Sequence, residues 1–283
     1  MEIRFNNVSY EYKGIKKSEK KAIDNISLEI KKNKINCIIG PSGSGKTTLM
    51  ELVNALLIPT DGKINVGKFV IDKNKKNINV KELRFNVGLI FEFPEQQFFK
   101  STVKKEIEFG LKQYEYKLKN IDKRISDSLL MVGLNDSFLN RNPFTLSNGE
   151  MRKVAIASVL ALNPKVIIFD EPTVGLDDAS KNNLLKLLRM LKTRYKKTII
   201  VVTHDVDALH KIADHIFVLN DGKVILEGDK YEVFKEVDLL QNYKIKVPKI
   251  IEFSHKVFKS KNIKMGYRDE INDLIKDIYR HVK

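Results

Sequence analysis

Residues 36–50 read Asn-Cys-Ile-Ile-Gly-Pro-Ser-Gly-Ser-Gly-Lys-Thr-Thr-Leu-Met, an apolar run that passes through a glycine-rich loop into a helical pattern. Within it, Gly40, Gly45, Lys46 and Thr47 fit the spacing G-x-x-x-x-G-K-[ST]. Glycines let the backbone curl so that successive N–H groups point at one anion, and the positive end of the following helix favours the same anion. The stretch therefore predicts a phosphate-binding loop, in which Lys46 reaches the β- and γ-phosphates and the Thr47 hydroxyl binds Mg²⁺.

An ordinary strand–turn–helix with a chance lysine is the alternative interpretation of this stretch. Against it, residues 37–39 supply the short buried strand that the motif requires immediately before the loop.

Farther along the chain, apolar strand patterns alternate with helical patterns, which predicts an α/β fold with a mostly parallel sheet. The expected strands are 2–10, 22–31, 86–91, 166–169, 198–203, 216–219 and 223–227, and the expected helices are 47–57, 102–118, 121–132, 145–161 and 179–195. Asp61-Gly62 is expected to form a hairpin turn and 70–81 a polar loop.

Composition limits the class of protein. The 283 residues include 42% hydrophobic residues, no apolar run approaches 18 residues, and residues 1–5 lack the apolar stretch of a signal peptide. The single cysteine, Cys37, lies in a predicted buried strand, so we expect a reduced thiol and a cytoplasmic protein. The net charge is +15, but only 9 of the 51 basic residues are Arg, the residue that nucleic-acid readers favour. The charge alone leaves open a lysine-rich surface or a nearby anionic membrane.

Two further segments carry candidate chemistry. The apolar strand 166–169 ends in Asp170-Glu171 and resembles a Walker B motif, whose aspartate binds Mg²⁺ through water. Glu171 is then placed to orient or deprotonate an attacking water. Ser147 and Glu150 form an S-x-x-E pattern, which predicts a capping box at the start of a helix.

Residues 146–150, Leu-Ser-Asn-Gly-Glu, resemble the L-S-G-G-Q signature of ATP-binding cassette (ABC) ATPases and precede Asp170 by 20 residues, as in that family. Residues 174–177 look like its D-loop, 203–205 like its switch histidine and 87–92 like its Q-loop. The resemblance covers about residues 1–228. It implies a P-loop NTPase with a mostly parallel core sheet, an N-terminal antiparallel β subdomain, a helical signature subdomain and a small C-terminal extension.

The resemblance also implies roles for particular residues. It implies that Glu171 and His204 are catalytic and that Mg²⁺ is bound by Thr47, Glu92 and Asp170. The residues expected to bind ATP are Tyr12, which matches the adenine-stacking aromatic, and Gly40, Pro41, Ser42, Gly43, Ser44, Gly45, Lys46, Thr47 and Thr48. The residues expected to contact the ATP of a partner subunit in trans are Ser147, Asn148, Gly149, Glu150 and Asp177.

Two stretches, 91–99 and 149–157, look more specifically like the ATPases of energy-coupling factor (ECF) transporters, which import vitamins and some metal ions. The Met-Arg-Lys at 151–153 suggests the second of their two ATPase subunits.

The expected domains are an ABC ATPase domain at 1–229, with its helical subdomain at about 93–160, and an extension at 230–283 that joins two ATPases. Glu92 replaces the Q-loop glutamine, and Asn148 and Glu150 replace residues of the signature, which leaves open whether the paired ATP sites are equally active.

The resemblance implies the ATP-hydrolysing subunit of an ECF-type importer at the cytoplasmic face of the cell membrane. Its expected partners are a sister ABC ATPase, a transmembrane coupling subunit and a substrate-binding membrane subunit, with no nucleic acid. One alternative is a soluble ABC ATPase acting on nucleic acid or ribosomes, but such factors usually carry two cassettes or coiled-coil insertions, and no heptad run appears. Another is the ATPase of a conventional ABC importer, against which 92–99 and the C-terminal extension argue. The resemblance implies that a separate membrane subunit chooses the cargo.

Overall fold

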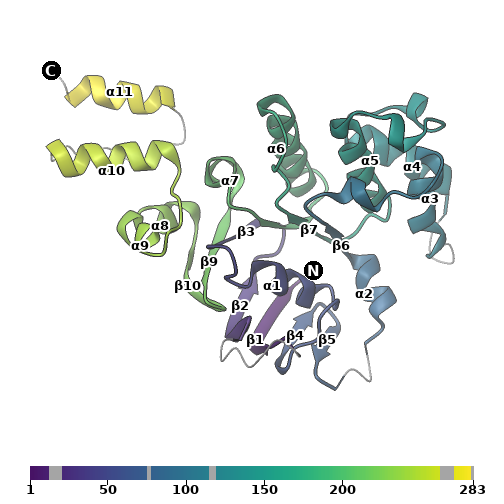
Figure 1. Ribbon diagram of the computed structural model, residues 1–283, viewed down its shortest axis with the longest axis horizontal. Helices are drawn as coiled ribbons and strands as arrows, with labels where there is room; N and C mark the ends of the chain where they lie inside the picture. Colours follow the sequence, from purple (N-terminus) through teal and green to yellow (C-terminus); the bar gives the residue numbers. More distant parts are fainter. Residues whose placement is uncertain (13–20, 75–77, 115–118, 262–270, 282–283) are drawn as a thin grey trace.

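The computed structural model covers residues 1–283 and describes residues 1–12, 21–74, 78–114, 119–261 and 271–281. Its central sheet has six strands in the order β10-β9-β3-β8-β7-β6, and five of them are mutually parallel (Figure 1). Only β10 runs antiparallel, as the hairpin partner of β9. The strands are β3 (Ile35–Ile39), β6 (Val87–Ile90), β7 (Val166–Asp170), β8 (Thr198–Val202), β9 (His215–Asn220) and β10 (Lys223–Gly228). The predicted mostly parallel α/β sheet is confirmed.

The strands β3 and β8 are buried at every residue, and β7 at all but its last. Strands covered on both faces carry continuous apolar runs instead of alternating patterns, which is why these segments were recognisable in the sequence. Cys37 lies in β3 as a buried free thiol. Because these parallel strands end at one edge of the sheet, the loops that follow β3, β7 and β8 lie close together.

A second, antiparallel sheet has the order β2-β1-β4-β5 and consists of β1 (Ile3–Tyr10), β2 (Ile23–Ile30), β4 (Asp61–Val66) and β5 (Phe69–Asp72). Two sequence expectations were wrong here. Asp61 and Gly62 do not form the hairpin turn but begin β4, and the chain turns between Val66 and Phe69. The expected loop at 70–81 contains most of β5 and the start of α2 (Val80–Asn86). The pairing of β5 with β4 outweighs its weak local pattern.

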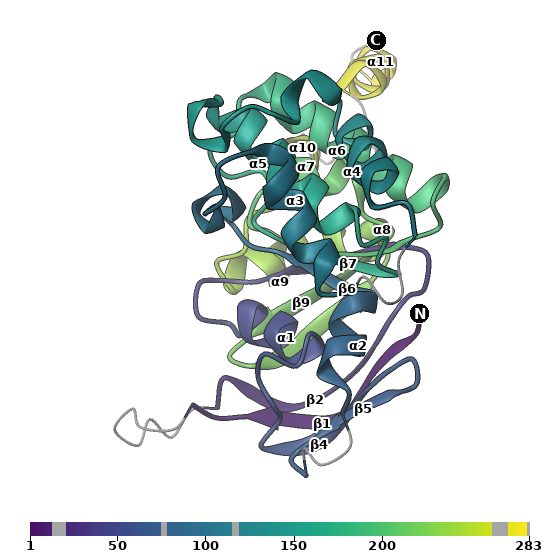
Figure 2. The ribbon, with the colours of Figure 1, turned by 90° about the vertical axis from the view of Figure 1, so that its right-hand side faces the viewer.

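The helix α1 (Lys46–Val53) lies between the two sheets (Figure 2). Its Leu49, Met50 and Leu52 are buried in one cluster with strand residues from both sheets, including Phe5 and Ile168. The opposite face of the six-stranded sheet is covered by α6 (Asp178–Thr193) and α7 (Val206–Ile212), which belong to a second apolar cluster. Packing on both sides therefore holds the phosphate-loop helix against the central sheet.

Three helices form a group at the β6 edge of the central sheet: α3 (Val103–Lys112), α4 (Ile121–Met131) and α5 (Asn148–Leu160) (Figure 1). The short 3₁₀ turns η1 (Pro94–Gln97), η3 (Asp136–Phe138) and η4 (Pro143–Thr145) connect and flank them. The predicted capping box at α5 is confirmed, because the Ser147 hydroxyl accepts the Glu150 N–H and the Glu150 side chain accepts the Ser147 N–H.

After β10 the chain forms α8 (Lys230–Phe234), α9 (Val237–Asn242), α10 (Lys249–Lys261) and α11 (Ile271–His281). Val233, Phe234, Val237 and Leu240 are buried against the core of the central sheet. The helices α10 and α11 extend away from the body of the molecule (Figure 1). Among the described side chains of these two helices, the exposed large apolar ones are Phe253, Phe258, Ile275 and Tyr279. Over the described residues, no helix has both the length and the apolar character needed to cross a membrane.

Candidate functional site

A pocket of about 480 Å³ lies where the phosphate loop meets the ends of β7 and β8. It contains nearly all the residues that the sequence predicted for nucleotide and metal binding in one subunit. The lining residues are Tyr12, Ala22, Gly40, Ser42, Gly43, Ser44, Gly45, Lys46, Thr47, Thr48, Glu92, Asp170, Glu171, Val202 and His204. Pro41 is absent from this lining, although its carbonyl oxygen accepts a hydrogen bond from Lys46. Ala22 and Val202 were not predicted, because only the folded chain brings them beside the loop.

Two glycines of the loop, Gly40 and Gly45, are required by close approaches of the backbone. A Cβ atom on Gly40 would lie 2.2 Å from the carbonyl oxygen of Leu219 in β9. Gly45 has a φ of +102°, and a Cβ atom there would lie 2.4 Å from the carbonyl oxygen of Ala22. Any larger residue would have to displace main-chain atoms at these positions, so the loop can keep its shape only with glycine.

The Lys46 ammonium group lies within the curl of the phosphate loop. Its Nζ donates to the carbonyl oxygens of Gly40 at 2.9 Å and Pro41 at 2.8 Å. Burial lowers the pKa of Lys46, while the nearby carboxylates of Glu171 and Asp170 act in the opposite direction. The side chain therefore places a cation between the loop and the carboxylates at the end of β7.

Asp170 is the most strongly perturbed carboxyl group of the pocket. Burial, followed by the charges of Glu171 and Glu92, raises the pKa of Asp170 to about 6. Such a concentration of carboxylate oxygens suits a hard divalent cation, which would offset the repulsion. Among the described residues, no group of three or more His, Cys, Asp or Glu side chains is arranged to hold a metal alone. The oxygen donors of Thr47, Glu92 and Asp170 in the pocket lining suit Mg²⁺, which commonly takes one or two carboxylates and completes its shell with phosphate and water.

Asp170→Asn is expected to stabilise the nucleotide-free protein at pH 8. A carboxyl group whose pKa is raised on folding binds more protons in the folded state, so stability falls as the pH rises from about 4 through about 6. After allowance for partial exposure, we expect roughly 1 kcal/mol, or about 2–4 °C in the unfolding midpoint, with the difference shrinking at pH 5. Thermal unfolding at both pH values measures this difference.

Asp238→Asn is the control. A hydrogen bond from Lys259 lowers the pKa of Asp238, so removal of the Asp238 carboxylate should not raise the unfolding midpoint. An unchanged or lower midpoint for Asp170→Asn at pH 8 would contradict the conclusion that burial and the neighbouring charges disfavour the Asp170 carboxylate.

Glu171 and His204 are held together across two strand ends. The Nδ1 of His204 lies 2.9 Å from Oε1 of Glu171, and the His204 main-chain N–H donates to Oε2 at 3.2 Å. Glu171 has a φ of +43°, a left-handed conformation that is unfavourable for a non-glycine residue. Its own N–H donates to the carbonyl oxygen of Val202, which ties this conformation to β8. The carboxylate is therefore fixed in one orientation at the pocket, as sites that store local strain often require.

Tyr12 lies at the open edge of the pocket. Its hydroxyl group is 3.0 Å from the Thr48 hydroxyl, and its ring meets Tyr10 edge-to-face with centroids 4.9 Å apart. The residue is 43% exposed, so part of its surface is accessible beside the loop. This is the position that the sequence predicted for stacking on a base.

The residues predicted to act in trans lie elsewhere. Ser147, Asn148, Gly149 and Glu150 form the N-terminus of α5, and Asp177 caps α6 through a 2.7 Å hydrogen bond from the Ser180 N–H. None of these five residues lines the pocket described above. The pocket therefore brings the cis residues together and leaves these five on a separate surface.

Comparisons with known proteins show which family this chain resembles. The ABC transporter family model matches residues 23–174. The chain is 38% identical over 263 residues to energy-coupling factor transporter ATP-binding protein EcfA2 of Staphylococcus epidermidis, covering 93% of this chain and 92% of that protein. It is 40% identical over 263 residues to EcfA2 of Mycoplasma capricolum, with 93% and 91% covered.

Two solved structures are similar throughout the fold. The structure of cbiO1 from Clostridium perfringens, part of the ABC transporter complex cbiONQ, matches with a TM-score of 0.73 and 32% identity, covering 89% of this chain and 98% of that one. The ATP-binding cassette MJ0796, a dimer in a post-hydrolysis state with ADP and Pi, matches with a TM-score of 0.71 and 30% identity, covering 80% and 98%. These findings confirm the ABC ATPase fold and do not favour the nucleic-acid or ribosome alternative. The chain belongs to the ABC transporter family and, within it, to the ATP-binding proteins of energy-coupling factor transporters.

Proposed function

We propose that the pocket binds and hydrolyses Mg²⁺-ATP and that the chain powers an ECF-type importer as one of a pair of ATPases. The observation that carries this proposal is the convergence of Lys46, Asp170, Glu171 and His204 on one pocket beside the phosphate loop. Three different strand ends supply these residues, so their meeting is a property of the fold. The family membership supports the same activity, ATP hydrolysis coupled to transport.

In the proposed complex, the N–H groups of the loop bind the phosphates, and Lys46 moves its hydrogen bonds from loop carbonyls to phosphate oxygens. The exposed part of Tyr12 stacks on the adenine. Thr47, Glu92 and Asp170 would hold Mg²⁺, which would neutralise charge on the transferred phosphate. The loop residues proposed to contact ATP are Gly40, Pro41, Ser42, Gly43, Ser44, Gly45, Lys46, Thr47 and Thr48.

For hydrolysis, we assign Glu171 as the group that orients and deprotonates the attacking water. Its two carboxylate oxygens are already positioned by the His204 side chain and main chain. His204 thereby controls the direction of the base, and it is exposed enough to reach a phosphate when a partner closes over the pocket. The hydrogen bond from the Glu171 N–H to Val202 holds the left-handed backbone of Glu171 in place.

A sister ATPase completes each site in this proposal. Ser147, Asn148, Gly149, Glu150 and Asp177 would contact the ATP held by the partner's phosphate loop, since they lie outside the chain's own pocket. The extension at 230–283 would join the two ATPases through the exposed apolar side chains of α10 and α11. Bringing the two chains together would thus assemble two composite sites.

The membrane partner would dock where the segment after β6 exposes aromatic rings. Phe99 is 56% exposed and packs edge-to-face on Phe109. The main-chain N–H groups of Phe99 and Lys100 donate to the buried Glu106 carboxylate at 3.1 and 2.8 Å, so the loop is presented rigidly. A transmembrane coupling subunit would bind this surface, together with a substrate-binding membrane subunit for a vitamin or metal ion. The chain would then lie at the cytoplasmic face of the membrane.

The experiment is to co-express the chain with a sister ATPase and both membrane subunits and to measure ATP hydrolysis and uptake in vesicles. We expect the isolated chain to hydrolyse ATP poorly, since a monomer holds only part of each composite site. Activity should rise in the assembled complex and require Mg²⁺. Fast hydrolysis by a demonstrably monomeric chain would contradict the pairing, and absence of hydrolysis in the intact complex would contradict the proposed function.

Glu150→Gln is expected to tighten the ATP-dependent pairing of the two ATPases. A glutamate charge about 10 Å from a phosphate costs roughly 0.4–1.7 kcal/mol per phosphate charge at an effective dielectric constant of about 20–80. Glutamine can still accept the Ser147 N–H, so the capping box and the unfolding temperature should be preserved. Nucleotide-dependent association, measured by analytical ultracentrifugation, tests the change.

The matched control is Glu232→Gln, which makes the same substitution in the capping box of α8. It should leave association unchanged. If Glu150→Gln also leaves association unchanged or weakens it, Glu150 serves only to cap the helix.

A further inference from the structure

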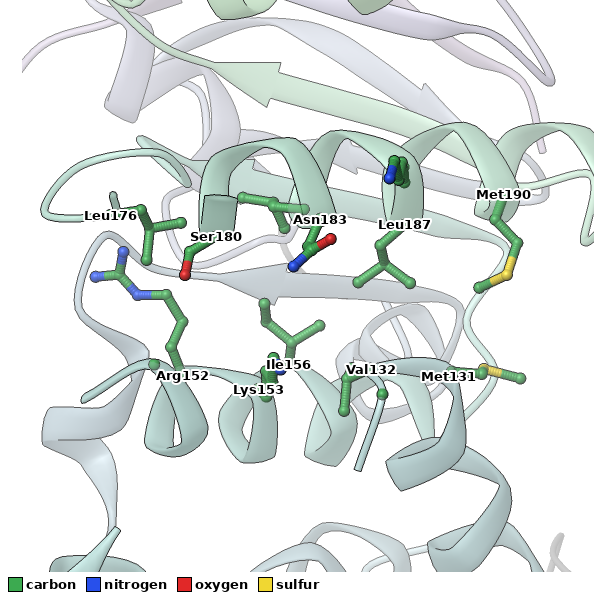
Figure 3. Close-up of a pocket in the computed structure, with 14 residues that line it drawn as sticks. Met131, Val132, Arg152, Lys153, Ile156, Leu176, Ser180, Asn183, Leu187 and Met190 are labelled. Carbon is green, nitrogen blue, oxygen red and sulfur yellow. The ribbon is translucent and has the colours of Figure 1, made fainter. Parts of the chain in front are cut away.

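The helices α5 and α6 are separated along part of their length by a groove of about 560 Å³ (Figure 3). Its walls are mainly apolar and include Ile156 on α5 and Leu187 and Met190 on α6. Side chains leave this space between the two helices open, so a shift of α5 toward α6 would meet no packed side chains here. The contacts at the ends of the groove therefore decide which loops follow a movement of α5.

Arg152 reaches from α5 across one end of this groove toward Leu176 and Ser180 (Figure 3). Its side chain is only 8% exposed. Nη1 donates to the carbonyl oxygen of Val174 at 2.5 Å, and Nη2 donates to the carbonyl oxygen of Glu92 at 3.1 Å. Nη2 also lies 3.5 Å from Oε1 of Glu95. The guanidinium group thus joins one helix to two loops.

These two loops carry a proposed Mg²⁺ ligand, Glu92, and the proposed water-activating group, Glu171. Glu92 follows β6, lines the pocket and begins the segment that leads to the exposed Phe99. Val174 lies in the loop that begins at Glu171 and ends at Asp177, the cap of α6. A guanidinium group holds its two Nη donors apart in a rigid plane, so it can bind two separate carbonyl oxygens, whereas an ammonium group donates from a single atom on a flexible stem. The geometry is therefore particular to arginine.

We propose that Arg152 is a positioning residue that makes the Glu92 and Glu171–Asp177 loops follow movements of α5. This inference rests on the proposed function, in which the N-terminus of α5 meets the partner's ATP. A shift of α5 into the groove is transmitted through the guanidinium group to both main-chain carbonyls. The ATP bound by one subunit thereby determines the positions of two loops in the other subunit. One loop holds the water-activating group, and the other leads to the surface proposed to face the membrane.

The test compares Arg152→Gln and Arg152→Lys with wild type in the complete transporter complex. We expect kcat for ATP hydrolysis to fall about 10- to 100-fold in both variants, because a displacement of reacting groups by about 1 Å costs up to about 100-fold in rate. The KM for ATP should stay within about 2-fold, because the phosphate loop is untouched. Lysine should not rescue kcat, since it lacks the fork. Lys186→Gln removes a positive charge from the same groove and should leave kcat unchanged.

Hydrogen exchange supplies a second measurement that does not depend on activity. In the same complex, Arg152→Gln should speed amide exchange in residues 92–99 and 171–177 by about 10-fold and leave 40–48 unchanged, since only the first two segments lose their tie to α5. Wild-type kcat and wild-type exchange in the folded variants would overturn the inference. If wild type does not hydrolyse ATP but the exchange result holds, the proposed function fails and the positioning role stands. If Arg152→Gln does not fold, Arg152→Lys carries both measurements.

Discussion

Glu171→Gln is expected to leave ATP binding intact and to lower the rate of hydrolysis in the assembled complex by about 10²- to 10⁴-fold, the usual contribution of a general base. The amide has the size and shape of the carboxylate but cannot take a proton from water. Its oxygen can still accept the His204 main-chain N–H, so the local geometry should survive. The change therefore isolates proton transfer from positioning.

Two measurements check this expectation. Equilibrium binding of ATP should give a dissociation constant within about 2-fold of wild type, and steady-state hydrolysis should show the loss in kcat. The paired ATPases should also remain associated for longer in ATP, because hydrolysis no longer releases them. Glu227→Gln, which removes an exposed carboxylate from β10, is the control and should behave as wild type. Full turnover by Glu171→Gln would exclude Glu171 as the base.

Lys46→Ala is expected to weaken ATP binding itself. The ammonium group is held by the Gly40 and Pro41 carbonyls, so it is already in the loop before nucleotide arrives. Losing a charge-assisted hydrogen bond costs about 1.5–3 kcal/mol, which corresponds to roughly a 10- to 150-fold higher dissociation constant. Hydrolysis at subsaturating ATP should fall by at least as much.

Titration calorimetry with ATP gives the dissociation constant directly. Lys63→Ala is the matched control, because Lys63 is an exposed lysine on β4. Thermal unfolding shows whether the loop remains folded, and we expect a small change, since burial already lowers the pKa of Lys46 and disfavours its charged form. Unchanged affinity in a folded Lys46→Ala protein would reject the assignment of the pocket as the ATP site.

The parts of this protein that the sequence by itself determined are local in origin. The phosphate loop was recognisable because Gly40, Gly45 and Lys46 must occupy fixed positions for a backbone to curl around an anion. The buried strands were recognisable because parallel strands covered on both faces need continuous apolar runs. The capping box was recognisable because Ser147 and Glu150 are three residues apart and satisfy each other's main-chain N–H groups.

Some local signals were misleading. Asp61-Gly62 has the composition of a turn, yet pairing with β1 draws it into β4. The lysine-rich segment after Val70 has a weak strand pattern, yet β5 forms because β4 offers a partner. In both cases hydrogen bonds between strands outweigh the preference of a few residues, and a single sequence does not reveal which strand will be adjacent.

Only the tertiary structure decided the contacts between distant segments. His204 holds Glu171 across 33 positions of the chain, and Tyr12 meets Thr48 across 36. Arg152 appeared in the sequence only as part of a family-like tripeptide, whereas in the fold its guanidinium group joins α5 to the loops after β6 and β7. Spacing along the chain predicts which neighbours share a turn or a helix face, but the meeting of strand ends depends on the order of strands in the sheet, which sheet pairing alone establishes.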